Sequence, residues 1–564
     1  ELMIETRGTL LDNSKKKTKK QTEAWLETEG WKRAIKEINV LKKNDKPFEH
    51  FDWKLDFPEI LNPLVNENAG FDIVIGNPPY IESKKLTKED KDVFKNYKTA
   101  SGKFDVFCLF IELSENLLKE KGIHSFINPT TFFNKDFGKA LRNYIHTFFN
   151  VLEIFDFNDY QVFPTAITYT GIFIFQKNEN KNNSFIYQKL DKRGQVKSLN
   201  TLFLNKESST FKETFDISLD EFQNKNWVFI NPVEQKLILD ILSDSLILKD
   251  ITKYIFVGIQ SGNDSVFFIE ESEIKKYNLE MDIIFPILKG KDVKKYNINW
   301  SGKYVIYPYE LNTNKVLEES EFHSRYPNAY QYLLENRNNL SGRSYFENSS
   351  KQWFELWCER NFQKFQQTKI VNAEIAPNNR FQIDYNGYLG NTKIFSTVLI
   401  KDFEDKYLDL LGLLNSKILN YYHKLTASPK AGGFYDYKTQ FIEKYPIKFP
   451  KGNALKTLVS YVLYLNDNSL NSLSLKLKTT YFEQIIDGIV YEIYFPELLK
   501  KHNRTIIEHL GELPAFKEST TDTQKQEIID NIFKRLDDKN HPVRNNLFYM
   551  SNIEEIAIIE GKNN

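Results

Sequence analysis

Short apolar runs alternate with amphipathic stretches in the first third of the chain. The run at residues 71–75 is apolar apart from one aspartate, a pattern typical of a buried parallel strand. Residues 104–120 place apolar side chains at helical spacing, and strand and helix signals continue to alternate up to residue 176. This alternation predicts an α/β fold with a doubly wound sheet.

The first predicted strand ends abruptly at Gly76, and the sequence continues Asn77-Pro78-Pro79-Tyr80. Two consecutive prolines cannot continue a sheet ladder, so the chain must leave the sheet as a rigid, extended turn. Ligands of open α/β sheets bind at the carboxyl ends of the strands. The turn therefore predicts a substrate site that presents one amide, two prolyl carbonyl groups and one aromatic ring.

This set of groups suits chemistry on a planar amine. An NH₂ group conjugated to a π-system is a poor nucleophile, because its lone pair is delocalised. The Asn77 side-chain oxygen and the Pro78 carbonyl are both acceptors, and together they can draw such a nitrogen toward tetrahedral geometry. The ring of Tyr80 offers a face on which a planar substrate stacks. The alternative is a plain strand-end turn with an exposed tyrosine.

Asn-Pro-Pro-Tyr after such a strand resembles the signature of S-adenosylmethionine-dependent amino-methyltransferases, above all the adenine-N6 DNA methyltransferases of restriction–modification systems, including the single-chain type IIG-like enzymes. The similarity covers residues 50–177 and continues at 102–112, 122–129 and 155–175. The resemblance implies a catalytic set made of Asn77, Pro78, Pro79, Tyr80 and Phe163, where Phe163 is the second aromatic beside an extruded base. It also implies contacts of Gly76, Asn77 and Phe110 with the S-adenosylmethionine cofactor.

The rest of the chain resembles a TaqI-like target-recognition domain, at residues 254–269, 288–296, 353–357, 413–417 and 432–438. Glutamine methyltransferases with the same tetrapeptide carry no such appendage, so the resemblance implies double-stranded DNA as the partner. Gln, Asn and Arg side chains can make bidentate contacts with bases, and lysines or paired glycines suit a nearby phosphate backbone. The candidate DNA contacts are Gln260, Asn263, Lys289, Lys291, Arg343, Gly432 and Gly433. A solvated charged surface and a plain glycine turn are the alternatives.

Composition changes this picture in one respect. Lys plus Arg and Asp plus Glu both number 76, so the chain is formally neutral, whereas DNA-binding proteins are usually more basic. DNA binding therefore requires basic groups that are concentrated in one cleft or that lie on residues outside this chain. The two cysteines, Cys108 and Cys358, lie far apart, and no Cys/His spacing suits zinc, which predicts a reducing cytoplasm and no metal. No apolar run reaches the roughly 18 residues that a membrane span needs.

The predicted organisation has five parts. They are a helical linker at 1–50, the catalytic part of a Rossmann-like methyltransferase domain at 51–177, a linker or peripheral hairpin at 178–235, a mixed α/β recognition domain at 236–450, and a helical region at 451–564. Nothing before residue 71 resembles the glycine-rich loop that holds the cofactor. The family's motif order therefore implies an upstream cofactor-binding half, with the possibility of an upstream nuclease domain.

These observations predict a site-specific DNA adenine-N6 methyltransferase that belongs to a restriction–modification enzyme and acts on a flipped adenine. Two alternatives stay open. One is a DNA-binding specificity module without activity of its own. The other is a methyltransferase with the same tetrapeptide that acts on RNA or on glutamine.

Overall fold

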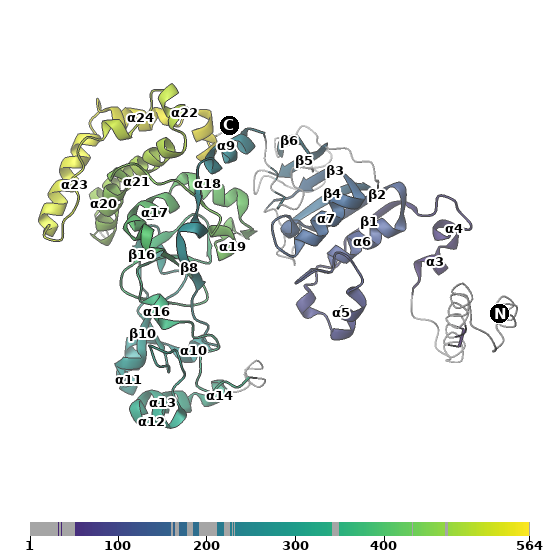
Figure 1. Ribbon diagram of the computed structural model, residues 1–564, viewed down its shortest axis with the longest axis horizontal. Helices are drawn as coiled ribbons and strands as arrows, with labels where there is room; N and C mark the ends of the chain where they lie inside the picture. The colour runs from purple at the N-terminus through teal and green to yellow at the C-terminus, as the bar shows by residue number, and fades with distance from the viewer. Residues whose placement is uncertain are drawn as a thin grey trace, which may run out of the picture.

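The computed structural model describes most of the chain beyond residue 50. The described residues are 32, 35–36, 51–158, 162–163, 169–177, 184–190, 211–218, 226–227, 229, 232–340, 349–430, 432–468 and 472–562. The helical linker expected at 1–50 therefore lies almost wholly outside them. Figure 1 shows two bodies, which we name the sheet region (51–229) and the C-terminal region (232–562).

The sheet region is built on six strands in the order β1-β2-β4-β3-β5-β6. The strands are β1 (Phe71–Gly76), β2 (Leu118–Pro129), β3 (Phe149–Asp156), β4 (Thr170–Lys177), β5 (Ser184–Leu190) and β6 (Phe211–Ser218). β1 is parallel to β2, and β4 runs antiparallel between β2 and β3. β5 and β6 continue the same sheet as an antiparallel pair beyond residue 177, where we placed the end of the catalytic part.

Helices α6 and α7 supply most of the apolar cover of this sheet. The helices here are α3 (Trp53–Asp56), α4 (Pro58–Leu61), α5 (Lys88–Phe94), α6 (Phe107–Leu117) and α7 (Gly138–Phe148), with 3-10 turns η1 (Ser83–Lys85) and η2 (Thr130–Phe133). Phe107 and Ile111 of α6 and Ile145 of α7 are fully buried in one core with Phe173 and Phe175 of β4. The helix expected at 104–120 is thus present but shorter, because the chain turns into β2 at residue 118.

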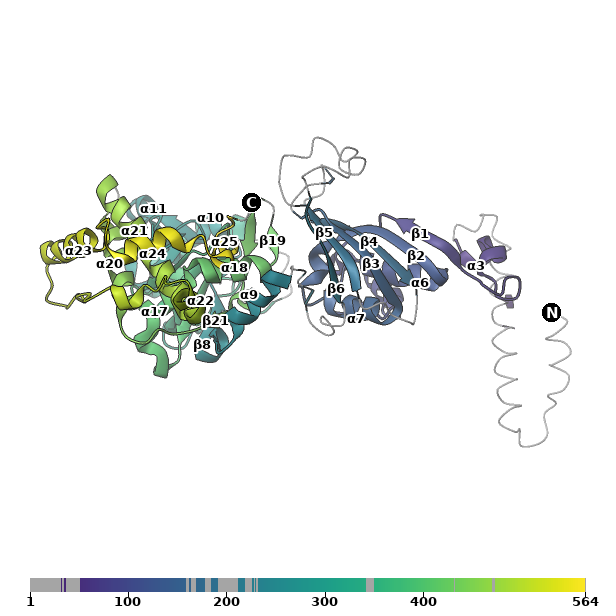
Figure 2. The same ribbon diagram turned by 90° about the horizontal axis from the view of Figure 1, so that it is seen from above.

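The expectation that residues 71–75 form a buried strand is wrong for its outer side chains. Ile73 is 61% exposed and Ile75 is 79% exposed. The physical reason is that successive side chains point to opposite faces of a strand: Val74 packs against the core, and Ile73 and Ile75 lie on the other face. Among the described residues, β1 also pairs on one side only, with β2. Figure 2 shows β1 at the margin of the sheet, on the side away from β6. An apolar sheet edge of this kind is a site for further strand pairing.

The C-terminal region combines small sheets with many helices. Its sheets have the orders β17-β10-β13-β9, β16-β14-β18-β8, β15-β20-β19, β11-β12 and β21-β7. The strands are β7 (Leu246–Ile247), β8 (Thr252–Val257), β9 (Phe268–Glu270), β10 (Ile284–Leu288), β11 (Val293–Lys294), β12 (Asn297–Ile298), β13 (Lys303–Ile306), β14 (Lys369–Ala373), β15 (Ile375–Ala376), β16 (Phe381–Asp384), β17 (Leu389–Gly390), β18 (Ile394–Leu399), β19 (Pro429–Lys430), β20 (Phe434–Asp436) and β21 (Pro446–Ile447).

The helices of the C-terminal region pack with these strands into two large buried cores. They are α9 (Pro232–Leu242), α10 (Asp264–Phe267), α11 (Glu271–Tyr277), α12 (Glu319–Arg325), α13 (Pro327–Glu335), α14 (Arg337–Leu340), α16 (Phe362–Phe365), α17 (Tyr407–Leu414), α18 (Lys417–Thr426), α19 (Thr439–Ile442), α20 (Ala454–Asn468), α21 (Leu473–Tyr494), α22 (Pro496–Lys501), α23 (Asp522–Leu536), α24 (Pro542–Met550) and α25 (Glu554–Ile559). One core includes α10 to α16, and the other includes α9 and α17 to α25 and runs from Leu237 to Ile559. The helices after residue 451 are therefore packed onto the mixed α/β part and do not form a separate unit.

None of the helices among the described residues is long and apolar enough to span a bilayer.

Candidate active site

The Asn-Pro-Pro-Tyr segment follows β1 directly and belongs to no helix or strand, as the two prolines require. Asn77 and Pro79 are exposed, Pro78 is buried and Tyr80 is half-buried. Within the described part of the chain, no hydrogen bond to the Asn77 side chain is recorded. The Asn77 amide is thus accessible to a substrate at the carboxyl end of the strand.

Asp105 and its neighbours hold the residues that follow the turn. The Val106 amide donates to the Ile81 carbonyl at 2.9 Å, and the Ser83 amide donates to the Phe104 carbonyl at 2.8 Å. The Asp105 carboxylate accepts the Ile81 amide at 2.9 Å. Burial raises the pKa of Asp105, although backbone amides that donate to it act in the opposite direction. Asp105 therefore positions the turn from the start of the next helix, a role that the sequence did not indicate.

Tyr80 is anchored at both ends of its side chain. Its hydroxyl donates to the Ile127 carbonyl of β2 at 3.0 Å, and its ring packs against the core of the sheet region. Burial, with a smaller contribution from the Asp105 charge, raises the pKa of Tyr80 to about 12. Tyr80 consequently stays protonated at neutral pH, which suits an aromatic wall and excludes a role as general base.

Tyr80 forms part of a cavity of about 560 Å³ that both regions line. This volume lies within the range of typical small-molecule pockets. The sheet region contributes Tyr80, Glu82, Lys85, Lys103, Asp105, Pro129, Thr130, Thr131, Phe133, Asn134, Lys135, Phe137, Asp156, Asn158, Tyr169, Tyr187, Lys189, Trp227 and Phe229. The C-terminal region contributes Lys424, Leu425, Ala427, Ser428, Pro429, Lys430 and Tyr435.

The cavity is basic although the whole chain is neutral. Six lysines line it, against three carboxylates, those of Glu82, Asp105 and Asp156. Each carboxylate is already engaged: Glu82 pairs with Lys84, and Asp105 accepts backbone amides. Asp156 accepts the Tyr187 hydroxyl at 2.7 Å and the amide of residue 158 at 2.7 Å. The concentration of basic groups that a DNA-binding reading requires is therefore present in this cavity.

One direct hydrogen bond joins the two regions at the cavity. The Ser428 hydroxyl donates to the Asn134 side-chain oxygen at 3.0 Å. Asn134 follows η2 of the sheet region, and Ser428 immediately precedes β19 of the C-terminal region. The cavity wall thus depends on segments almost 300 residues apart, a proximity that no sequence pattern indicates.

Phe163 and Phe110 do not line this cavity. Phe163 is half-buried in the segment after β3, and its neighbour Val162 packs against Phe155 and Phe157. Phe110 lies on α6 with 37% of its side chain exposed, unlike the buried Phe107 one turn before it. Among the predicted catalytic residues, Tyr80 is the one that the structure brings to the cavity wall.

The predicted DNA contacts occupy different kinds of position. Gln260 has an exposed side chain, while its backbone exchanges two 2.9 Å hydrogen bonds with Cys358. Asn263 caps α10 through Ser265 and donates to the Asn339 carbonyl at 2.9 Å. Asn263 is therefore engaged in holding its own loop, and Gln260 is the more accessible of the two.

The remaining predicted contacts are mostly at the surface. Lys291 is exposed, and the ammonium of Lys289 lies 5.5 Å from the centre of the Phe268 ring. Gly432 and Gly433 have φ angles of +87° and +73°, which favour glycine, and they form the turn between β19 and β20. Arg343 lies outside the described residues.

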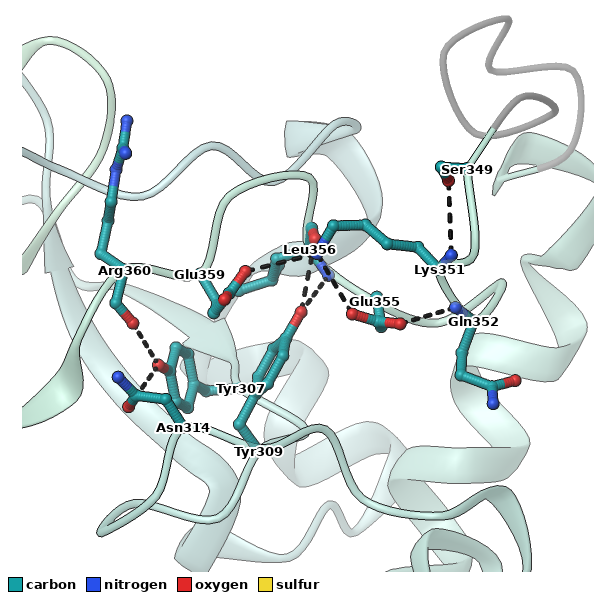
Figure 3. A network of polar contacts seen from close by, with 10 residues as sticks. All are labelled: Tyr307, Tyr309, Asn314, Ser349, Lys351, Gln352, Glu355, Leu356, Glu359 and Arg360. Atoms are coloured by element: carbon teal, nitrogen blue, oxygen red, sulfur yellow. Dashed lines mark hydrogen bonds and ion pairs between the residues drawn. The ribbon is translucent and has the colours of Figure 1, made fainter.

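The 353–357 segment belongs to a polar network that holds the C-terminal region together (Figure 3). The Lys351 ammonium lies 3.2 Å from Glu355 and 3.3 Å from Glu359. The Tyr309 hydroxyl accepts the Leu356 amide at 2.8 Å. In Figure 3 these side chains point toward one another, so they stabilise the loop and leave little polar capacity for a ligand.

Among the described residues, no group of three or more His, Cys, Asp or Glu side chains could hold a metal ion.

Comparisons with known proteins agree with this arrangement of two regions. Residues 3–163 match the family model of the Eco57I restriction-modification methylase, and residues 285–447 match that of the TaqI-like C-terminal specificity domain. The type II methyltransferase M.BanIII of Aneurinibacillus aneurinilyticus is 24% identical over 481 residues, covering 78% of this chain and 82% of that protein. The type II restriction enzyme and methyltransferase RM.Eco57I of Escherichia coli is 27% identical over 298 residues, covering 48% of this chain and 29% of that protein.

The fold is similar to that of a solved restriction–modification enzyme. The structure of the type IIL enzyme MmeI in complex with DNA matches with a TM-score of 0.50 and 12% identity, over 84% of this chain and 59% of that one. The two matched segments contain the Asn-Pro-Pro-Tyr turn and the cavity-lining β19 respectively. This chain therefore contains one segment that matches the Eco57I restriction-modification methylase family and a second segment that matches the TaqI-like C-terminal specificity domain.

Proposed function

We propose that the chain is the catalytic and target-recognition portion of a site-specific DNA methyltransferase that methylates the N6 amine of adenine. The observation that carries the proposal is the basic cavity between the Tyr80 wall and β19 of the specificity domain. Polyanionic DNA would be held there by lysines of both regions. A base inside a duplex cannot reach Tyr80, so the target adenine would have to be flipped out of the stack.

The turn would hold the target amine in a reactive geometry. The exposed Asn77 oxygen and the Pro78 carbonyl would accept hydrogen bonds from the two N–H groups of the adenine amine. This arrangement favours the nitrogen lone pair as nucleophile without a strong base, and the proton leaves after the methyl group has arrived. Stacking of the base against Tyr80 would return about 1–3 kcal/mol toward the cost of flipping.

S-adenosylmethionine is the cofactor that we propose for this reaction. Asn77 is exposed and Phe110 is 37% exposed, so both residues are open to contact with this molecule. Gly76 is packed against Phe126, where an added Cβ would lie 3.1 Å from the ring, so its size is needed for packing. When bound, S-adenosylmethionine supplies an electrophilic methyl group.

The exposed edge of β1 favours a second part to the proposal. Ile73 and Ile75 would be covered if a cofactor-binding half of the same enzyme added a parallel strand beside β1 and a helix over the face that carries them. In that case the chain alone would bind DNA but methylate it poorly. The isolated chain would then behave as a DNA-binding specificity module without activity of its own. A gel shift beside a methyl-transfer assay on the isolated chain separates the two.

The decisive test is methylation mapping of genomic adenine in cells that express the full-length protein, its Asn77→Ala variant or its Asn68→Ala variant. Asn68 is an exposed asparagine just before β1 and serves as the matched control. We expect N6-methyladenine at one short motif in the first and third strains. Loss of an oriented hydrogen-bonding group at a reaction centre costs about 100- to 1000-fold in rate, so the Asn77→Ala strain should lack the mark.

Purified Asn77→Ala protein should retain DNA affinity within about twofold, because Asn77 lies outside the lysine-lined cavity wall. Persistent motif methylation in Asn77→Ala cells would contradict the assigned chemistry. If RNA or glutamine is methylated in place of adenine in DNA, the protein is a methyltransferase for that other substrate.

A further inference from the structure

Two lysines from opposite regions lie next to residues that join these regions by a hydrogen bond. Lys135 follows η2 in the sheet region, Lys430 ends β19 in the C-terminal region, and both line the cavity. Their chain neighbours are close: the Ser428 hydroxyl donates to the Asn134 side-chain oxygen at 3.0 Å. The pair therefore straddles the boundary between the methylase and the specificity domain.

Negative charge at this boundary is too small to neutralise both lysines. The Asp436 carboxylate lies 3.4 Å from the Lys430 ammonium and 3.0 Å from that of Lys438, so two cations share it. Among the residues that the structure describes, no carboxylate is recorded within ion-pair distance of Lys135. The charges of Asp436 and Glu82 also act on Lys135, but Asp436 is paired with Lys430 and Lys438, and Glu82 is paired with Lys84.

The environment of Lys135 is unfavourable for an unliganded cation. The side chain is half-buried, and burial lowers the pKa of Lys135, with a further lowering from the charge of Lys430. A lysine on a solvated surface would experience neither effect. Cations gathered at a partly buried boundary are stabilised when an anion enters between them.

We propose that Lys135 and Lys430 form one binding site for a DNA backbone phosphate at the boundary between the two regions. This inference rests on the proposed function and adds which residues hold the anionic group of the substrate. One phosphodiester would accept hydrogen bonds from both ammonium groups. Because that phosphate would contact both regions, binding it would fix the specificity domain relative to the Tyr80 wall and so couple recognition to base delivery.

The test measures how DNA affinity depends on salt. The Lys135→Gln, Lys430→Gln and double variants are titrated against a fluorescent duplex that contains the methylated motif, at several salt concentrations. Lys275→Gln is the matched control, since Lys275 is an exposed lysine on α11 that pairs with Glu271. Each phosphate contact contributes about 0.9 to the slope of log affinity against log salt.

One shared phosphate predicts that the double variant loses about 0.9 of slope in total. The control should keep the slope of the unsubstituted protein, and Lys430→Arg should keep it as well. An unchanged slope in the double variant overturns the inference. A loss of about 1.8 also overturns it, because two separate phosphates would then be bound.

The two proposals fail in distinguishable ways. If the unsubstituted protein binds no duplex DNA, the proposed function fails and takes this inference with it. If it binds and methylates DNA, and the lysine variants keep its slope of log affinity against log salt, only the proposed phosphate site is wrong. Unchanged thermal unfolding midpoints in the variants confirm that the comparison is made between folded proteins.

Discussion

The interior of the C-terminal region and the cavity that both regions line use lysine in opposite ways. In the C-terminal region, the Lys369 ammonium is fully buried 2.5 Å from the Asp384 carboxylate, also fully buried, and Lys351 sits between two glutamates. In the sheet region, Lys135 faces a cavity with no recorded ion pair among the described residues. The difference shows how to tell the two kinds of lysine apart. A lysine that is paired with a carboxylate stabilises the fold, whereas a lysine in a cavity without such a partner is available to bind a ligand.

The regions also differ in where their exposed apolar side chains lie. The C-terminal region is built on two large cores, and exposed apolar residues such as Leu473 and Phe548 lie on helices far along the chain from the proposed chemistry. β1 of the sheet region instead exposes Ile73 and Ile75, next to the turn that carries the proposed chemistry. The exposed apolar side chains of β1 thus lie beside the proposed reaction centre.

The largest effect that would test this comparison comes from breaking the buried ion pair. Lys369→Met leaves the Asp384 carboxylate buried and unpaired, which should cost about 3–5 kcal/mol of unfolding free energy in the C-terminal region. Denaturant unfolding followed by tryptophan fluorescence measures it. The double variant Lys369→Met with Asp384→Leu should recover most of the loss, since no unpaired charge remains. A cost below about 1 kcal/mol for the single variant would show that this charge is not a scaffold element.

A smaller effect should appear in both regions on acidification. His124 in β2 and His423 in α18 are fully buried, and burial lowers the pKa of each to about 3. The unfolded chain takes up these protons near pH 6.5 while the folded protein does not, so stability falls as pH drops below about 6.5. Each histidine should cost about 2 kcal/mol between pH 6.5 and pH 5.

Denaturant unfolding of the His124→Phe and His423→Phe variants at the two pH values tests this assignment. Each substitution should remove acid sensitivity from its own region and leave that of the other region unchanged. Equal acid sensitivity in a variant and the parent protein would mean that the histidine is not buried in its neutral form.

The smallest effect concerns the hydroxyl of Tyr80. Tyr80→Phe keeps the stacking face and removes the hydrogen bond to the Ile127 carbonyl, which should cost about 1 kcal/mol, or about fivefold in methylation rate. Its pH–rate profile from pH 6 to 9 should match that of the parent, because the pKa of Tyr80 is about 12. Tyr80→Ala should be slower still through loss of stacking. A changed profile in Tyr80→Phe would indicate that the hydroxyl takes part in proton transfer.

The sequence by itself determined the local elements of the site. Asn-Pro-Pro-Tyr had to leave the sheet as an extended turn, because proline has no amide hydrogen and a restricted φ angle. The resemblance of its surroundings and of residues 254–438 to methyltransferase and recognition domains agrees with the two family matches. The mixed α/β fold could also be predicted from the sequence, because strand and helix periodicities are local properties of the chain.

Only the tertiary structure decided which residues share the site and which strand faces outward. The apolar pattern of 71–75 predicts burial but cannot say how many neighbours a strand has or whether both of its faces are covered, so the exposure of Ile73 and Ile75 was missed. Lys135 and Lys430 are almost 300 residues apart, and each alone looks like an ordinary surface lysine. Their meeting depends on how two separately folded regions pack, and packing between distant segments leaves no periodic signal in the sequence.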